Sequence, residues 1–347
     1  MSARARPGHP HPPITIAMPA VAGMLSGVRQ RHGGAWVQAL LAQAGIPASV
    51  LEHPQGRVTG EQYVALFRLL MDTLDDECLG LMQRPMRRGS FALVARSTHG
   101  VPTAHAALRR IAQGFDLLAD AVQARVVQEG DALGLAWTLR PGQPQPPNFL
   151  YEMLMRVGWR LLAWLHGGRL MPLRCDFCFA RPDYAGIYAQ VFASPLRFGQ
   201  ARATIWFERA ALERPVRRTP AELEHFLQGS PANVVLPWLG ERATSTRVHL
   251  LLRQAGPQWP DLHAAARALH MAASTLQRHL AQEGTSFQAL KDQLRRDLAI
   301  MRLGTSGQPL SAIAAELGFS DSATFQRAFK AWTGSAPGLY RRQADRV

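Results

Sequence analysis

The stretch Thr275-Leu276-Gln277-Arg278-His279-Leu280 returns 49 residues later as Thr324-Phe325-Gln326-Arg327-Ala328-Phe329. Apolar positions upstream of each stretch repeat at an offset of 48, which places one extra residue in the second copy. They are Leu262, Leu269 and Met271 in the first copy, and Leu310, Leu317 and Phe319 in the second. Each copy therefore predicts a short helix, a tight turn and a second helix, the pattern of a helix-turn-helix unit.

The second helix of each copy has an apolar and a polar side. Leu276 and Leu280 lie four residues apart and share one helix face, which we expect in the core. Gln277 and Arg278 fall on other faces, and these residue types can form paired hydrogen bonds with adenine and guanine edges or reach phosphates. A single such pair fits an ordinary solvent-exposed face better. Its recurrence at the same helix position in both copies, within a basic helical domain, favours contacts with DNA bases.

A helix over residues 286–303 is predicted to join the two copies. Its apolar side consists of Phe287, Leu290, Leu294, Leu298 and Met301. At a rise of about 1.5 Å per residue this helix is roughly 27 Å long. With the width of the units added, the two polar helices would reach successive major grooves, about 34 Å apart on one face of DNA.

The composition bounds the function without deciding it. The 347 residues suit two domains, and 39 Lys+Arg against 25 Asp+Glu give +14, a charge that attracts polyanions. Residues 241–347 carry only +6 of it, so charge alone does not identify the partner. Lys291 and Lys330 are the only lysines and neither follows a glycine, which excludes a GK[ST] phosphate loop; HExxH, GxSxG and EF-hand signatures are also absent. We expect no enzyme activity, cofactor or metal site.

The three cysteines support one alternative. Cys78, Cys175 and Cys178 are too few for a disulfide framework, which favours a reducing cytoplasm. Cys175 and Cys178 form a CxxC in an apolar run typical of a strand, where residues three apart point to opposite faces. We interpret them as ordinary buried or half-buried thiols. A thiol-based redox protein or enzyme in the N-terminal domain is the competing hypothesis.

No segment predicts export or membrane insertion. Residues 14–25 are apolar enough to suggest a signal segment, but prolines before and within the stretch interrupt it. The most apolar helical stretch, 148–166, contains Glu152, Arg156 and Arg160, which argues against a membrane span.

Helical and strand patterns alternate before residue 219. Thr59 and Gln62 have capping-box spacing ahead of an amphipathic helix, and Thr103 caps a second one. The remaining expected elements are a hairpin over 122–137, a helix over 149–166, a strand near 172–180, a short helix near 184–191 and a strand over 203–207. We predict two domains. The divisions are a disordered tail (1–20), an α+β domain (21–218), a linker (219–244) and an all-α domain with two helix-turn-helix units joined by a long helix (245–343).

Residues 245–343 resemble the AraC/XylS family of bacterial transcription regulators. The resemblance is most specific over Ile313–Asp321, followed by Phe325, Arg327, Ala328, Phe329, Trp332, Gly334, Pro337, Tyr340 and Arg341. It implies a seven-helix domain that binds double-stranded DNA. The base-facing positions that it implies are Ser274, Gln277 and Arg278 in the first unit, and Ser322, Ala323, Gln326 and Arg327 in the second. We add Lys330 as a candidate phosphate contact.

The first unit departs from the family pattern. Ala272 stands where the family often has a capping Ser, and Ser274 where it often has Arg. His270 occupies the position that Gly318 holds in the second unit, where a residue ending the helix favours positive φ. Non-specific architectural DNA binding is a third hypothesis, against which the repeated Gln-Arg pair argues.

The N-terminal part is similar to the arabinose-binding type of effector and dimerisation domain. The residues that carry this weaker resemblance are Gly80, Leu81, the helix over 102–118, Arg181 to Tyr184, Phe192, Pro195, Leu196, Phe198 and Leu212 to Val216. It implies a small-molecule sensor and a homodimer, and a regulator of this kind, expected to be an activator, works with RNA polymerase. Trp137, Trp159, Phe177 and Trp206 fit the core better than a pocket.

Overall fold

The computed structural model describes residues 15–46, 51, 56–168, 170–192, 194–236, 244–255, 259–282, 285–333 and 336–344. The chain divides into two compact units, Ile16–Gly240 and Glu241–Arg346. In the predicted tail, residues 1–14 lie outside the described residues.

A five-stranded sheet forms the centre of the first unit, in the order β3-β4-β7-β5-β6. The strands are β3 (Val122–Glu129), β4 (Ala132–Leu139), β5 (Arg174–Asp176), β6 (Leu196–Arg197) and β7 (Ala203–Glu208). β5 and β6 are parallel and the other pairs antiparallel. The predicted hairpin is confirmed: β3 and β4 pair in register around Gly130, whose positive φ of 55° suits the tight turn.

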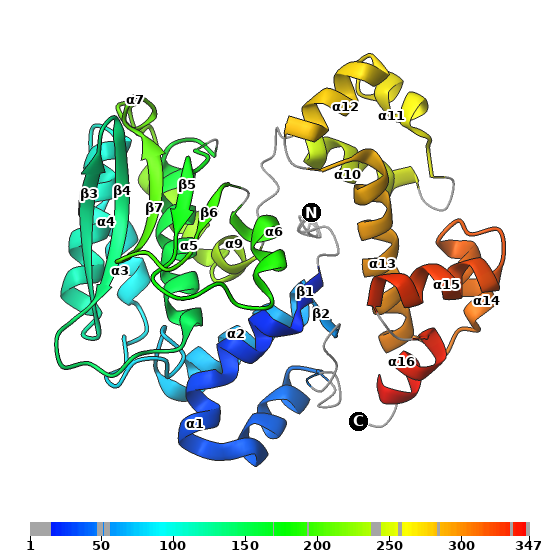
Figure 1. Cartoon of the computed structure of the whole chain (residues 1–347), viewed down its shortest axis with the longest axis horizontal. Helices are drawn as coiled ribbons and strands as arrows, with labels where there is room; N and C mark the ends of the chain where they lie inside the picture. The colour runs from blue at the N-terminus through cyan, green and yellow to red at the C-terminus, as the bar shows by residue number, and fades with distance from the viewer. Residues whose placement is uncertain are drawn as a thin grey trace, which may run out of the picture. The chain divides into compact units, whose positions relative to one another are not determined.

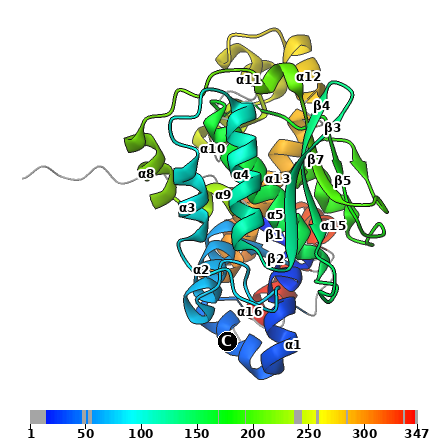
Figure 2. The same ribbon diagram turned by 90° about the vertical axis from the view of Figure 1, so that its left-hand side faces the viewer.

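Helices α4 (Ala104–Leu118) and α5 (Asn148–Leu165) cover one side of this sheet (Figure 1 and Figure 2). The close approach of α5 depends on Gly158, because a Cβ there would lie 2.7 Å from the Leu135 side chain. Thr103 caps α4 as predicted, with its side chain accepting from the Ala106 N–H at 3.2 Å. Burial of the apolar faces of both helices against the sheet makes the core of the unit.

Further helices extend the first unit beyond the sheet. They are α1 (Met18–Gln43), α2 (Gly60–Leu74), α3 (Ser90–Ser97), a 3-10 turn (Ala185–Ile187), α6 (Tyr188–Phe192) and α7 (Arg209–Leu212), with a small sheet of β1 (Thr15–Ala17) and β2 (Arg57–Thr59). The predicted capping box of α2 is present, with Thr59 and Gln62 bonded to each other's backbone N–H. The predicted strand near 172–180 is shorter than expected, and β5 ends before Cys178.

Both predicted boundaries of this domain are wrong. Residues 15–20 belong to β1 and the start of α1, where Pro19 is tolerated because the first helical turn needs no N–H from it. The predicted linker contains α8 (Pro220–Gln228) and α9 (Ala232–Val235), which pack on the first unit. Arg96 pairs with Glu224 at 2.8 Å. Phe226 also stacks on Trp164, with ring centroids 4.5 Å apart.

The second unit is helical throughout its described residues, as predicted. The part of this unit that the structure describes forms seven helices: α10 (Thr244–Ala255), α11 (Leu262–Ala268), α12 (Ala273–Gln282), α13 (Phe287–Thr305), α14 (Leu310–Glu316), α15 (Ser322–Thr333) and α16 (Pro337–Ala344). The helix that joins the two halves, α13, is the predicted one, with bounds shifted by one or two residues.

Candidate DNA-binding surface

The second unit contains two helix-turn-helix units, which we call the first and second HTH. The first HTH consists of α11, a turn over residues 269–272 and α12. The second consists of α14, a turn over residues 317–321 and α15. The second turn is one residue longer, as the change of offset in the sequence predicts.

Helix α13 is the common spine of the two HTH cores (Figure 1). Phe287, Leu290 and Leu294 are buried with the first HTH, whereas Ala299, Ile300 and Leu303 are buried with the second. Of the predicted apolar side, Phe287, Leu290 and Leu294 are buried, and Leu298 is half-buried against both cores. Met301 is half-buried. The buried face changes along the helix because the second core lies on a different side of α13 from the first.

The recognition helices α12 and α15 bury the positions predicted for them. Leu276, Leu280, Phe325 and Phe329 are each 0% exposed. The sequence-predicted DNA contacts lie away from that core: Ser274, Gln277, Arg278, Ala323, Gln326, Arg327 and Lys330 are exposed, and Ser322 is half-buried. Both helices thus present a glutamine followed by an arginine in the same frame. Direct contact of these side chains with bases stays a prediction.

Local hydrogen bonds organise the polar side of α15. Asp321 accepts from the Thr324 N–H at 2.7 Å and from its hydroxyl at 2.8 Å, the arrangement of a helix N-cap. These bonds to the charged form hold the pKa of Asp321 at about 2, well below its usual 3.8. Arg327 donates to the Thr324 hydroxyl at 3.0 Å, and Gln326 to the Ser322 hydroxyl at 3.3 Å. The second HTH therefore holds its polar side chains close to the helix that carries them.

Both turns contain a residue with positive φ directly after the residue that ends the first helix. Gly318 has a φ of 69°, which confirms the positive φ expected at this position. His270, at the matching position of the first HTH, has a φ of 56°. A side chain in this left-handed region is disfavoured, so the first turn is the more strained. Ala272 also matches Asp321 and offers no side-chain oxygen for a cap.

Two arginines of α13 bind the second HTH, and neither was identified from the sequence. Arg295 donates to the carbonyl oxygens of Leu317 and Gly318, at 3.0 and 3.1 Å. Arg302 pairs with Glu316 at the end of α14, with Nε 2.8 Å from Oε1. The Asp321-x-x-Thr324 cap was also missed, although its spacing is a visible helix-start signal. The arginine contacts carry no comparable signal because they join residues far apart in the chain.

The aromatic residues and the CxxC cysteines that stand out in the sequence have the surroundings of ordinary core residues. Trp137, Trp159, Phe177 and Trp206 are buried, and Trp159 and Trp206 use their ring N–H to bond the Leu170 carbonyl and Asp176. Cys175 is fully buried, with its sulfur 3.4 Å from the Ser194 hydroxyl. Burial raises the pKa of Cys175 to about 12 and raises that of Cys178 as well.

Among the described residues, no helix combines the length and the apolar character that a membrane span requires. No group of three or more His, Cys, Asp or Glu side chains in this part of the chain is placed to hold a metal ion.

Two recognition helices on one spine, in a chain that also contains a separate α/β unit, define a DNA-binding protein with an additional domain. The family model described as the arabinose-binding domain of AraC transcription regulator matches residues 34–216. A helix-turn-helix domain model matches residues 265–343. Together the two matches span most of both units.

Curated relatives agree with these matches. The ornithine utilization regulator of Pseudomonas aeruginosa is 31% identical over 324 residues, which cover 88% of this chain and 90% of that protein. The HTH-type transcriptional regulator VirS of Mycobacterium tuberculosis is 29% identical over 202 residues, 58% of each chain. Among solved structures, the transcriptional regulator CdpR from Pseudomonas aeruginosa is 22% identical, with coverage of 93% and 97% and a TM-score of 0.33. The chain belongs to the AraC family of DNA-binding transcription regulators.

Proposed function

We propose that the two recognition helices read two neighbouring elements of one operator. Gln277 and Arg278 with Ser274 contact bases in the first element. Ser322, Ala323, Gln326 and Arg327 contact bases in the second, where Lys330 holds a phosphate. The observation that carries this proposal is the matched exposure of the Gln-Arg pair on α12 and α15, above cores that are fully buried.

We further propose that the first unit binds a small-molecule effector and pairs with a second copy of the chain. Support comes from the match of residues 34–216 to an effector-domain model and from a relative whose name refers to ornithine utilization. In this proposal the protein acts in the cytoplasm as an activator that works with RNA polymerase, without catalysing a reaction or holding a cofactor.

Selection of binding sites from a randomised DNA duplex library tests the base contacts. We expect the wild-type chain to select two elements about one helical turn apart. Arg327→Ala should remove the preference at one position of one element, at a cost of about 1–3 kcal/mol for the favoured base. Lys330→Ala should keep the motif while weakening all sites similarly and reducing the salt dependence.

Arg109→Ala is the matched control, because Arg109 is an exposed arginine on α4 of the first unit. It should change neither motif nor salt dependence. A wild-type chain that selects no motif would contradict the proposed function. If Arg327→Ala lost affinity equally for every sequence, only the proposed base contact of Arg327 would be contradicted.

The thiol alternative has little support from the surroundings of the cysteines. The thiolate is the reactive form, and burial raises the pKa of both Cys175 and Cys178. Replacing both with Ser should leave reporter activation unchanged, and its loss together with reversible oxidation of the wild-type thiols would favour the alternative.

A further inference from the structure

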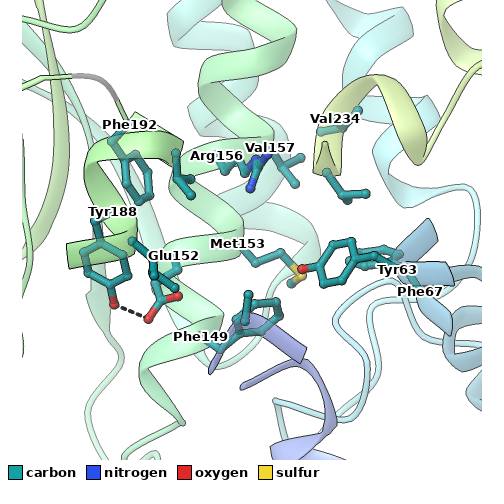
Figure 3. A pocket seen from close by; sticks show the side chains of 14 residues that line it. Tyr63, Phe67, Phe149, Glu152, Met153, Arg156, Val157, Tyr188, Phe192 and Val234 are labelled. Atoms are coloured by element: carbon teal, nitrogen blue, oxygen red, sulfur yellow. Dashed lines mark hydrogen bonds between the residues drawn. The ribbon is translucent and has the colours of Figure 1, made fainter. Parts of the chain in front are cut away.

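A small pocket lies in the first unit among α1, α2, α5, α6 and α9 (Figure 3). Its volume is about 40 Å³, room for a small group, since one water needs about 10–15 Å³ on the same measure. The walls are mainly apolar and include Tyr63, Phe67, Phe149, Met153, Val157 and Phe192. None of the four aromatic residues considered from the sequence lines it.

Two charged side chains, Glu152 and Arg156, enter this apolar space from α5. They lie four residues apart, a spacing at which a carboxylate and a guanidinium usually pair. Here the carboxylate is held by tyrosines instead. Tyr188 donates to Glu152 Oε1, a bond visible in Figure 3, and the Tyr184 hydroxyl donates to the same oxygen at 3.4 Å.

Arg156 has unused hydrogen-bonding capacity. Its Nη2 is buried and has no hydrogen-bond partner among the described residues. Arg160, one turn further along α5, has such a partner: its Nε and Nη2 donate to the Asn233 carbonyl oxygen at 3.0 and 2.5 Å. An unsatisfied buried donor on a charged group is costly, so its presence facing a pocket indicates a missing acceptor.

We propose that this pocket binds a small carboxylate with an apolar body, whose carboxylate accepts hydrogen bonds from Arg156. A guanidinium matches a carboxylate geometrically and strengthens the bond by its charge. The mainly apolar walls favour a hydrocarbon body and disfavour a doubly charged anion such as phosphate. The ligand class follows from the pocket alone. Its role as the effector rests on the proposed function.

The pocket is lined by a helix that precedes the DNA-binding unit in the sequence. Val234 and Val235 of α9 line the pocket, and Arg160 holds Asn233 of the same helix. Helix α9 ends at Val235 and α10 begins at Thr244. A ligand seated against α9 would therefore contact the last helix that the structure describes before α10.

Ligand-induced thermal shift and calorimetry on the full-length protein test this proposal. The probes are straight-chain carboxylates from acetate to hexanoate, their matched amides and amines, and inorganic phosphate. We expect at least one carboxylate to bind and stabilise the fold, and its amide, amine and phosphate counterparts to bind at least about tenfold more weakly.

Arg156→Met supplies the decisive variant, because it keeps the apolar stem and removes the unsatisfied donors. It should fold with unchanged or higher stability and bind the carboxylate at least about tenfold more weakly. Arg160→Met is the matched variant on the same helix, and it should lower stability because the Asn233 carbonyl loses its donors. Arg109→Met, exposed on α4, should change neither property.

The outcomes separate the ligand site from the regulatory role. No stabilisation by any carboxylate, or equal stabilisation of the wild-type chain and Arg156→Met, overturns the site. Stronger binding of phosphate or of the amides overturns the carboxylate class. Binding that depends on Arg156 but changes neither DNA affinity nor reporter output keeps the site and overturns its role as the effector site of the proposed function.

Discussion

Arg295 of α13 donates from Nη2 to the carbonyl oxygen of Gly318 at 3.1 Å. Its Nε donates to the preceding carbonyl, that of Leu317, at 3.0 Å. The same guanidinium lies over the Phe319 ring, 4.8 Å from its centroid. Carbonyl groups at a helix end lack partners within the helix. One side chain of the spine therefore completes the end of α14 and fixes the turn that presents α15.

Arg295→Met should loosen this turn without unfolding the domain. It removes two charge-assisted hydrogen bonds, an expected loss of about 2 kcal/mol in local stability. Backbone amide exchange of residues 317–321 should then be roughly 30-fold faster. Mass spectrometry of the exchanged full-length protein measures this. Arg267→Met, at an exposed position on α11, is the control. Unchanged amide exchange in Arg295→Met would show that the turn is stable without the two hydrogen bonds from Arg295.

The backbone of the two turns predicts opposite effects of glycine exchange. His270→Gly should stabilise the first HTH by about 0.5–1 kcal/mol, because its φ of 56° suits glycine. Gly318→Ala should destabilise the second HTH by about 1–2 kcal/mol, because its φ is 69°. Local amide exchange measures both. A destabilised His270→Gly would mean that the histidine side chain contributes more than its backbone strain costs.

The caps of the two recognition helices predict an acid dependence at α15 that α12 lacks. The depressed pKa of Asp321, about 2, means that the folded state favours its charged form. The resulting stability is present above the usual pKa of 3.8 and is lost as the pH falls toward 2. Asp321→Asn should remove this part of the acid dependence in the α15 segment. Ala272→Asp should introduce a similar dependence at α12, and its absence there would show that the first turn cannot form the cap.

Much of the DNA-binding unit was predictable because its information is local and repeated. Leu276, Leu280 and their aromatic counterparts have helical spacing, and the extra residue of the second turn is visible as a change of offset. The same periodicity places Arg278 and Arg327 on exposed faces. Contacts between residues far apart in the sequence were not predictable. The main example is Arg295, which donates to the carbonyl oxygens of Leu317 and Gly318.

The first unit was harder to predict, since its boundaries depend on packing. Residues 219–236 contain Gly, Pro and charged residues and were predicted to be a linker. In the structure, Phe226 stacks on Trp164 and Glu224 pairs with Arg96, so this segment packs on the first unit. The pocket was equally hidden: Glu152 and Arg156 served in the sequence only as an argument against a membrane helix. The hydrogen bonds that Tyr184 and Tyr188 donate to Glu152 depend on the tertiary structure.

Glu152 predicts a second pH dependence, of opposite sign, in the first unit. Burial raises its pKa from 4.5 to about 7, against the lowering effect of hydrogen bonds from Tyr188 and Tyr184 and of the nearby Arg156 charge. Between these values the folded chain keeps a proton that the unfolded chain has lost. This contribution to stability is therefore complete below pH 4.5 and is lost as the pH rises through about 7.

Glu152→Gln is neutral at every pH and should remove this loss, which amounts to roughly 3 kcal/mol for a shift of that size. Neither nearby titratable group changes its charge between pH 4.5 and pH 7. Burial lowers the pKa of Arg156 only to about 10, and burial raises the pKa of Tyr63 to about 12. Denaturant unfolding of the first unit, followed by amide exchange of α5 at pH 5 and pH 8, measures the difference. Equal pH dependence in Glu152→Gln and the wild-type chain would place the titration elsewhere.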